Sequence, residues 1–261
     1  MTNTNSTTAN NSSVKSSTKS VSKLVYQARL ATTPIEIQKA QALRFEVFNL
    51  ELNEGLVESF DAGLDIDAFD PVCAHLIVEH VGTGEIIGTY RLQTGLSAKQ
   101  HLGYYSEREF DFSPFEPMRA QMLELGRACI SAKHRNFAVL NLLWKGIASY
   151  GESQGTRYLI GCSSLTTQDK ALGVAAHQLM APHWAPAIWQ TRPLPGFECI
   201  AAPSRETPKI PRLLSAYLAL GASICSPPAI DRAFKTIDFL TMIDVRSPNV
   251  VALQQRGRFT A

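Results

Sequence analysis

The chain has 261 residues and a formal net charge of +2, with 45% hydrophobic and 18% charged residues. These values are typical of a soluble globular protein that buries a sizeable core. The small net charge argues against a nucleic-acid partner. No segment reaches the roughly 18 uninterrupted apolar residues of a membrane-spanning helix.

Five cysteines lie far apart in the sequence, and no two of them form a C-x-x-C pair. An odd number without paired spacing argues against a disulfide framework and against a structural zinc site. His75 and His134 likewise lack partners at ligand spacing. We therefore expect no bound metal and a cytoplasmic, reducing location.

The first 23 residues are mostly Ser, Thr and Asn, with three lysines and no acidic residue. Such a composition cannot bury enough apolar surface to fold, so residues 1–23 are expected to be a disordered tail. A Ser-rich transit peptide is the alternative, although the segment has no arginine. One domain is expected over residues 24–246, followed by a C-terminal tail over 247–261.

The domain is expected to begin with a strand over residues 24–31 and a helix from Thr33 to about Leu52. Thr33 is a suitable N-cap, with Pro34 at the first helical position and Glu36 at the third. The apolar face of this helix is expected to carry Ala40, Leu43, Val47 and Leu50.

A long acidic connection over residues 53–71 separates this helix from a predicted hairpin. The hairpin consists of strands over 73–80 and 85–93, joined by a Val-Gly-Thr-Gly turn. Residues 103–117 are rich in aromatic residues and interrupted by proline, so we expect a loop with one helical turn.

The next strand, over residues 122–130, carries a glutamate and an arginine inside an apolar run. Glu124 needs a charged partner or has a chemical task there, because burying a carboxylate is costly and raises its pKa towards that of a general base. Strict alternation places Arg127 on the opposite face of the strand. The two side chains therefore pair only if a bulge near Gly126 changes the alternation; otherwise Glu124 needs an arginine from elsewhere.

A strand-helix-strand unit follows from this point in the chain. Its helix is expected to begin at the Lys133–Asn136 segment and to end near residue 155, with Leu143 and Trp144 in the core. A strand is expected over 156–163 and a further helix over 166–180. This order of elements indicates a parallel pair of strands, so the fold class is α/β with a mixed central sheet. The last elements are expected to be a strand over 197–202, a helix over 208–220 and a strand over 236–245.

Five short motifs occur in the order in which one enzyme family has them. They are Arg44-x-x-Val47-Phe48, Asp65-x-Asp67-x-x-Asp70, Gly88-Thr89-Tyr90-Arg91-Leu92, Leu123-Glu124-Leu125-Gly126-Arg127 and Tyr158-Leu159-Ile160-Gly161-Cys162. Together they resemble the ornithine N-acyltransferase family, often called hemolysin-like, over roughly residues 25 to 245. That family belongs to the GNAT superfamily and is related to the acyl-homoserine-lactone synthases. The resemblance implies a GNAT-like fold and the first step of ornithine-lipid synthesis.

The implied reaction moves a 3-hydroxyacyl or other long acyl chain from acyl carrier protein to the α-amine of ornithine, giving lyso-ornithine lipid. Acetyl-CoA enzymes of this fold hold a pyrophosphate in a Q/R-x-x-G-x-G/A turn, whereas the stretch from Lys133 to Leu140 contains no glycine. The phosphopantetheine of acyl carrier protein has a single phosphodiester and fits this stretch better, so no permanently bound cofactor is expected. A separate O-acyltransferase would act on the product, whose amphiphilic character implies transient contact with the inner membrane surface.

The resemblance, together with the chemistry of the motifs, also suggests a role for each site residue. Glu124 and Arg127 are the catalytic candidates, with Glu124 as proton acceptor and backbone N–H groups near Gly126 as donors to the oxyanion. The substrate-binding candidates are Arg44, Arg91 and Arg127 for the carboxylate, Asp65, Asp67 and Asp70 for the side-chain ammonium, and Phe48. The acyl-pantetheine candidates are Gly126, Cys129 and Ser163.

Several alternatives stay open on the sequence alone. The arginines and aspartates can instead form a structural ion-pair network that shapes the pocket. Cys129 and Cys162 also fit positions in the core. The acceptor can be another amine, such as glycine, or the reaction can be synthesis of a lactone signal. A non-catalytic protein that binds acyl chains or membranes is the alternative from a different class.

Overall fold

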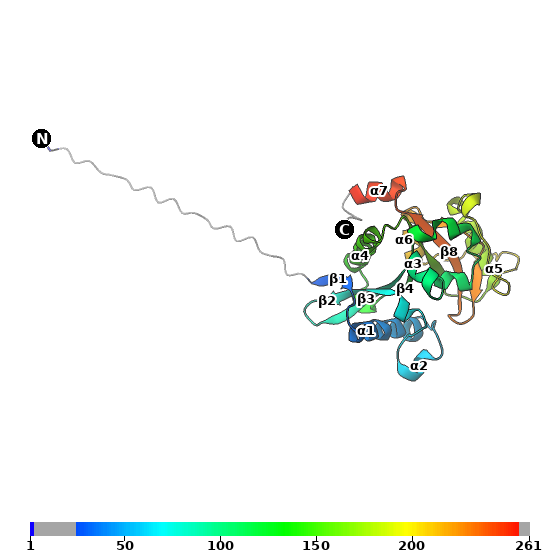
Figure 1. The fold of residues 1–261 in the computed structure, drawn as a ribbon, viewed down its shortest axis with the longest axis horizontal. Coiled ribbons are helices and arrows are strands. Elements are labelled where there is room, and N and C mark those ends of the chain that lie inside the picture. The colour runs from blue at the N-terminus through cyan, green and yellow to red at the C-terminus, as the bar shows by residue number, and fades with distance from the viewer. Residues whose placement is uncertain (3–24, 256–261) are drawn as a thin grey trace.

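The computed structural model describes residues 1–2 and 25–255, so the predicted tail over 1–23 falls almost entirely outside the described residues. Within the described part, eight strands form one mixed sheet in the order β1-β2-β3-β4-β5-β8-β6, and β7 also pairs with β8 (Figure 1). The strands are β1 (Tyr26–Leu30), β2 (Ala74–His80), β3 (Glu85–Thr94), β4 (Met122–Ile130), β5 (Tyr158–Leu165), β6 (Ser223–Ile224), β7 (Ala229–Asp231) and β8 (Thr236–Asp244). The helices are α1 (Pro34–Phe45), α2 (Ser59–Ala62), α3 (Gly95–Gln100), α4 (Phe137–Ser153), α5 (Lys170–Leu179), α6 (Arg212–Ala219) and α7 (Pro248–Gln255).

The sheet has two halves that meet at β4 and β5. Strands β1 to β4 are antiparallel, whereas β4 and β5 are parallel, which confirms the predicted strand-helix-strand unit with α4 as its crossover. The two parallel strands pair only from Met122 opposite Tyr158 to Glu124 opposite Ile160. Beyond that point β5 continues against β8 and no longer pairs with β4. From Leu125 onwards, β4 therefore has no paired strand on the side that faces β5.

Two helices cover the two faces of the first half of the sheet, α4 on one and α1 on the other (Figure 1). The α4 face buries Val139, Leu143 and Ile147 against strand residues such as Leu123, and Trp144 is buried there as predicted. The C-terminal helix α7 lies within the segment that was expected to be a tail after residue 246. Its Val250 packs into this same cluster, so the folded domain includes it. None of the described helices combines the length and apolar character needed to cross a membrane.

The first helix begins as the sequence predicts and then changes its winding. Thr33 caps α1 through a capping box with Glu36. After Phe45 the chain continues as a π-helix over Glu46–Glu51. The wider turn shifts every following side chain around the axis, which explains why Leu50, expected on the buried face, is exposed.

Strand β4 contains a β-bulge opposite β3. Thr89 pairs with Cys129 and Arg91 with Gly126, so one residue of β3 faces two of β4. The bulge reverses the alternation: Leu123 packs on the α4 face before it, whereas Cys129 packs beneath α1 after it. The bulge near Gly126 that the sequence left open as an alternative is therefore present, strict alternation does not hold, and the side chains of Glu124 and Arg127 lie on the same face.

The region after α5 differs most from the sequence-based expectation. No strand forms over 197–202, where the structure has only an isolated bridge between Glu198 and Ala229. The strands that pair with β8 on this side are β6 and β7, which have two and three residues and are too short to leave a periodic pattern. The helix predicted over 208–220 forms only from Arg212, as α6, and ends before Gly221, whose φ of 93° suits glycine.

Candidate active site

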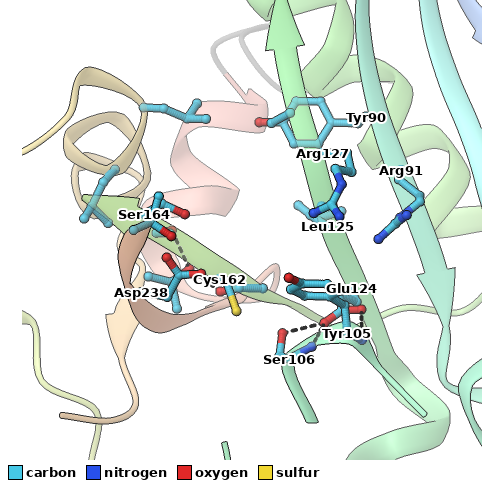
Figure 2. Close-up of a pocket in the computed structure, with 18 of the residues that line it drawn as sticks. Tyr90, Arg91, Tyr105, Ser106, Glu124, Leu125, Arg127, Cys162, Ser164 and Asp238 are labelled. Carbon is cyan, nitrogen blue, oxygen red and sulfur yellow. Dashed lines mark hydrogen bonds between the residues drawn. The ribbon is translucent and has the colours of Figure 1, made fainter. Parts of the chain in front are cut away.

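A cavity of about 340 Å³ opens where β4 and β5 diverge. Its walls come from β3, β4, β5, β8 and α6, together with the π-helical turn after α1. Figure 2 shows that arginines project into it from β3 and β4, whereas serine and aspartate side chains project from β5 and β8 on the far side. The cavity is therefore basic at one end and acidic at the other.

Glu124 lies on the wall of this cavity, at the last residue pair before β4 and β5 separate. Its side chain is buried and accepts hydrogen bonds from the backbone N–H groups of Tyr105 at 2.7 Å and Ser106 at 2.8 Å (Figure 2). The hydroxyl of Ser106 donates a third hydrogen bond. Burial raises the pKa of Glu124, and the donors from Ser106 and Tyr105 oppose that shift in part. The carboxylate is thus fixed in position and has an increased affinity for a proton.

Neither Arg127 nor any other described arginine forms an ion pair with Glu124. The guanidinium of Arg127 instead lies 2.7 Å from a carboxylate oxygen of Asp67 and 3.2 Å from one of Asp65. It is also stacked between the rings of Tyr105 and Phe234, at 5.0 and 4.2 Å from their centroids. Burial would lower the pKa of Arg127, but the carboxylates of Asp65 and Asp67 outweigh burial and raise it.

The backbone at Arg127 has a positive φ of 51°, which is uncommon for a residue other than glycine. The bulge imposes this conformation, and the contacts to two acids and two rings hold the side chain in the orientation that results. The unusual backbone conformation of Arg127 therefore places its guanidinium at the cavity wall.

The other predicted charged residues continue the same network below the cavity. Arg44 is fully buried and contacts Asp65 at 2.8 Å and Asp70 at 2.7 Å. Arg91 contacts Asp67 at 2.5 Å and Asp70 at 3.1 Å. Burial would raise the pKa of Asp70, but Arg44 and Arg91 hold it well below its usual value. Three arginines and three aspartates thus neutralise one another.

Of these six charged residues, only Arg91 and Arg127 also line the cavity. Arg44 and the predicted ammonium-binding aspartates lie behind that wall. For Arg44, the arrangement matches the alternative in which the arginines and aspartates form a structural ion-pair network. Arg91 and Arg127 take part in this network and also face the cavity.

The remaining predicted site residues divide in the same way. Phe48, Gly126 and Ser163 line the cavity, and the Ser163 hydroxyl lies 2.9 Å from that of Thr241. Cys129 is buried beneath α1, outside the cavity wall. A side chain at Gly126 would meet no atom within 4 Å, so its backbone is open to the cavity.

Gly161 has the opposite property to Gly126. A Cβ built on Gly161 would lie 2.3 Å from the carbonyl oxygen of Leu125, which is closer than two such atoms can approach. The absence of a side chain at this position lets β5 lie close to β4 at the point where the cavity begins.

Sequence reasoning missed the acidic end of the cavity. Asp231 and Asp238 line it from β7 and β8, and Glu109 is buried next to Asp238. Glu109 is more than a hundred residues from both aspartates, and Asp231 belongs to a strand too short to recognise. Asp238 is part of an Asp238-Phe239-Leu240 motif that contributes to the family resemblance, but nothing in that motif indicates an acid cluster.

Comparisons with known proteins place the chain among acyltransferases. Residues 43–145 match the model of the acetyltransferase (GNAT) domain family. The L-ornithine N(alpha)-acyltransferase of Agrobacterium fabrum is 32% identical over 238 residues, covering 85% of this chain and 81% of that protein. The enzyme of the same name from Brucella abortus is 32% identical with 84% of each chain covered, and that from Rhizobium meliloti is 30% identical with 84% and 80% covered.

Solved structures support the fold at much lower sequence identity. FeeM, an N-acyl amino acid synthase from uncultured soil microbes, aligns with a TM-score of 0.51 at 11% identity and covers 84% of this chain and 91% of that one. The coenzyme-A-dependent acyl-homoserine lactone synthase BjaI aligns with a TM-score of 0.50 at 12% identity, covering 89% and 88%. These likenesses confirm the predicted GNAT-like fold, with its mixed sheet and parallel β4-α4-β5 unit.

Proposed function

Because the chain belongs to the L-ornithine N(alpha)-acyltransferase family, we propose that it transfers a 3-hydroxyacyl or other long acyl chain to the α-amine of ornithine. The product is a lyso-ornithine lipid. The observation that carries this proposal is the position of Glu124, a buried carboxylate at the point where β4 and β5 open into a cavity with arginines on its wall.

Glu124 is the proton acceptor in the proposed reaction. The α-amine of an amino acid is largely protonated at neutral pH and has to lose one proton before it can attack a thioester. Glu124 takes that proton, directly or through one water. The nitrogen then bonds to the thioester carbon, the tetrahedral intermediate collapses, and the C–S bond breaks. The thiolate that leaves takes the second proton lost by the nitrogen.

The oxyanion of the tetrahedral intermediate requires hydrogen-bond donors that are already in place. The backbone of β4 after Glu124 has no paired residue in β5, and Gly126 presents no side chain to the cavity. We assign the oxyanion to N–H groups of this open segment between Leu125 and Arg127. The bulge at Arg127 supports the assignment, because it turns the backbone away from its regular ladder.

The acceptor carboxylate is assigned to Arg91 and Arg127. Both guanidinium groups line the cavity, and the aspartates behind them fix their orientation through ion pairs. A preorganised guanidinium binds a carboxylate without first losing the freedom of its own side chain. Arg127 is therefore a binding and orienting residue in this mechanism.

Acyl carrier protein is the proposed donor. In the structure α4 begins at Phe137, and the side chain of Asn136 accepts a hydrogen bond from the backbone N–H of Val139. This N-terminus lacks a glycine turn and one of its free N–H groups is already capped, which favours a single phosphodiester over a pyrophosphate. The acyl chain is placed at the apolar wall of the cavity formed by Leu159, Leu214, Tyr217 and Ile243.

Two partners follow from the chemistry of the product. A lyso lipid becomes a diacylated lipid only if a separate O-acyltransferase adds a second chain. The product is amphiphilic, so its release is expected to involve transient contact of the protein with the inner membrane surface.

Incubation of the purified protein with ornithine and either acyl carrier protein thioester or acyl-CoA tests the proposal. We expect release of free thiol and a product whose mass and fragmentation identify Nα-acylornithine, with acyl carrier protein the more efficient donor by about tenfold or more in kcat/KM. An acyl-homoserine lactone among the lipids of cells that express the protein would support signal synthesis instead. Absence of thiol release with every donor and acceptor would support a non-catalytic binding protein.

A further inference from the structure

A cluster of three side chains from distant parts of the chain lies at the acidic end of the cavity. Glu109 follows the short helical turn over Tyr105–Arg108, Cys162 lies on β5 and Asp238 on β8. A carboxylate oxygen of each acid and the sulfur of Cys162 all lie within 4.8 Å of one another. Asp238 and Cys162 line the cavity, and Glu109 is buried directly behind them.

The two acids have no cation to pair with. No described lysine, arginine or histidine nitrogen lies within ion-pair distance of either carboxylate. Both side-chain oxygens of Glu109 and the Oδ1 atom of Asp238 lack any hydrogen-bond donor among the described residues. Asp238 does accept hydrogen bonds from the side chains of Thr236 and Ser164. Glu109 is 2% exposed and Asp238 3% exposed, so water replaces the missing partners poorly.

Asp231, in the same cavity wall, has hydrogen-bond donors for both of its carboxylate oxygens. Its Oδ1 atom accepts from the N–H groups of Ala233 and Phe234, at 2.8 and 3.0 Å. Its Oδ2 atom accepts from the hydroxyl of Tyr105 at 3.2 Å. The lack of partners therefore concerns both oxygens of Glu109 and one oxygen of Asp238, and it is not shared by every acid of the cavity.

The groups around the pair make its charge unfavourable in the empty cavity. Burial and the charge of Asp231 raise the pKa of Asp238 to about 7, and Glu54 adds to the repulsion. Burial and the charges of Asp238 and Asp231 raise the pKa of Glu109, against a smaller opposing effect of Arg127. An acid pair of this kind gains most from a ligand that brings a positive charge.

We propose that Glu109 and Asp238 together bind the side-chain ammonium of the acceptor and thereby select a diamino acid over a neutral amino acid. This inference rests on the proposed function. An ammonium that donates to two oxygens at 2.8–2.9 Å, at a tetrahedral angle, separates them by about 4.6 Å. The two oxygens lie no more than 4.8 Å apart, so one ammonium can reach both.

The acid pair and Glu124 are connected through two side chains. The thiol of Cys162 hydrogen-bonds with Ser106, and Ser106 donates to Glu124. One thiol therefore lies between the acid pair and the residue that holds the proposed base. The two nitrogens of ornithine are separated by three methylene groups and the α-carbon, about 6 Å when extended. In the proposed binding mode, the α-amine lies at Glu124 and the other amine lies at Glu109 and Asp238.

The same cluster is a poor metal site. A cysteine binds a metal as the thiolate, and burial together with the charges of Glu109 and Asp238 raises the pKa of Cys162 well above its usual value. A neutral thiol between two acids leaves an ammonium as the better occupant. The aspartates predicted from the sequence for this task, Asp65, Asp67 and Asp70, are already paired with arginines.

Acceptor selectivity tests the inference. The full-length protein and the Asp238→Asn and Glu109→Gln variants are compared with L-ornithine and with L-norvaline, which has the same carbon chain without the second amine. For the unmodified protein we expect kcat/KM for ornithine to exceed that for norvaline by about a hundredfold. Either substitution should reduce this ratio at least about tenfold, through a higher KM for ornithine, while kcat/KM for norvaline changes by less than about threefold. Asp244→Asn, on the same strand but paired with Arg157 at the surface, is the matched control and should keep the full ratio.

A binding measurement complements the kinetics and does not depend on turnover. Ornithine should raise the Tm of the unmodified protein more than norvaline does, and this difference should disappear in both acid variants. Equal use of the two acceptors by the unmodified protein, or an equal loss of both in the variants, would overturn the inference. Stoichiometric Zn²⁺ binding that requires Glu109 and Asp238, and that does not inhibit the binding of ornithine, would also overturn it. Failure of the unmodified protein to acylate any amine would instead contradict the proposed function itself.

Discussion

Glu124 and Arg127 lie on the same face of β4, yet neither pairs with the other. The bulge between them brings both side chains to the cavity, and each is then held by a different part of the chain. Glu124 is held by N–H groups of the loop before β4, and Arg127 by aspartates of the loop before β2. A guanidinium bonded directly to Glu124 would lower the pKa of that carboxylate and make it a weaker base. The separation of the two residues therefore suits both proposed roles.

Replacement of Glu124 by glutamine should lower kcat by about a hundredfold or more, with little change in KM, and should also lower Tm, because the amide NH2 group then faces one of the two buried backbone N–H donors. The amide keeps the shape of the side chain but cannot accept a proton. In the unmodified protein, activity should rise with pH through the raised pKa of Glu124, and this acidic limb should be absent from the variant. The control is Glu116→Gln, which changes an exposed glutamate paired with Arg119. Unchanged turnover at every pH would show that Glu124 is not the base.

Replacement of Ser106 by alanine should move the acidic limb of the pH profile to higher pH by up to about one unit. The hydroxyl of Ser106 stabilises the ionised form of Glu124, so its loss raises the pKa of that carboxylate further. The backbone N–H donors remain, and kcat at high pH should fall only slightly. Ser153→Ala, in which the lost hydroxyl is exposed, should leave the limb in place. A limb that does not move would assign the titration to a group other than Glu124.

Replacement of Arg44 by methionine should lower the free energy of unfolding by about 3–5 kcal/mol, measured by denaturant titration. The change leaves Asp65 and Asp70 buried without their main cation. Arg157→Met removes a guanidinium from a more exposed pair with Asp244, and it should reduce the free energy of unfolding far less. Similar losses for the two variants would contradict the description of Arg44 as the centre of a buried network.

Asp238 and Asp70 should have opposite effects on stability in the absence of substrate. The pKa of Asp238 is about 7 in the folded protein and about 3.9 in the unfolded chain, so its ionisation lowers the stability of the folded state. This loss begins above about pH 3.9 and is complete above about pH 7. Asp238→Asn should therefore increase Tm at about pH 8 and have little effect near pH 4. The pKa of Asp70 is lowered, so its contribution is present above about pH 4 and is lost on further acidification. Asp70→Asn should decrease Tm at neutral pH, and thermal unfolding over this pH range measures both changes.

Replacement of Gly161 by alanine should destabilise the protein by about 2 kcal/mol or more and reduce the binding of acyl donors. The new methyl group collides with the carbonyl oxygen of Leu125 and forces β5 away from β4. Gly126→Ala is the matched control for stability, because its methyl group meets no neighbouring atom. A stable Gly161→Ala variant with normal donor binding would show that the close approach of the strands is not required.

Local signals in the sequence predicted much of the fold. The capping box at Thr33, the hairpin of β2 and β3 and the parallel unit around α4 depend on residues close together in the chain, and all three are confirmed. The family resemblance is confirmed as well. The missed strands β6 and β7 are too short to show periodicity, and the expected strand over 197–202 does not form.

The sequence by itself determined the family, the order of the main elements and the presence of a carboxylate and several arginines in apolar strands. Only the tertiary structure decided how these groups are used. The bulge at Arg127 reverses which side chains share a face, and a single inserted residue leaves no mark on composition. The choice of partners for Glu124 and the meeting of Glu109 with Asp238 depend on contacts across the sheet, since electrostatic interactions act through space and not along the chain.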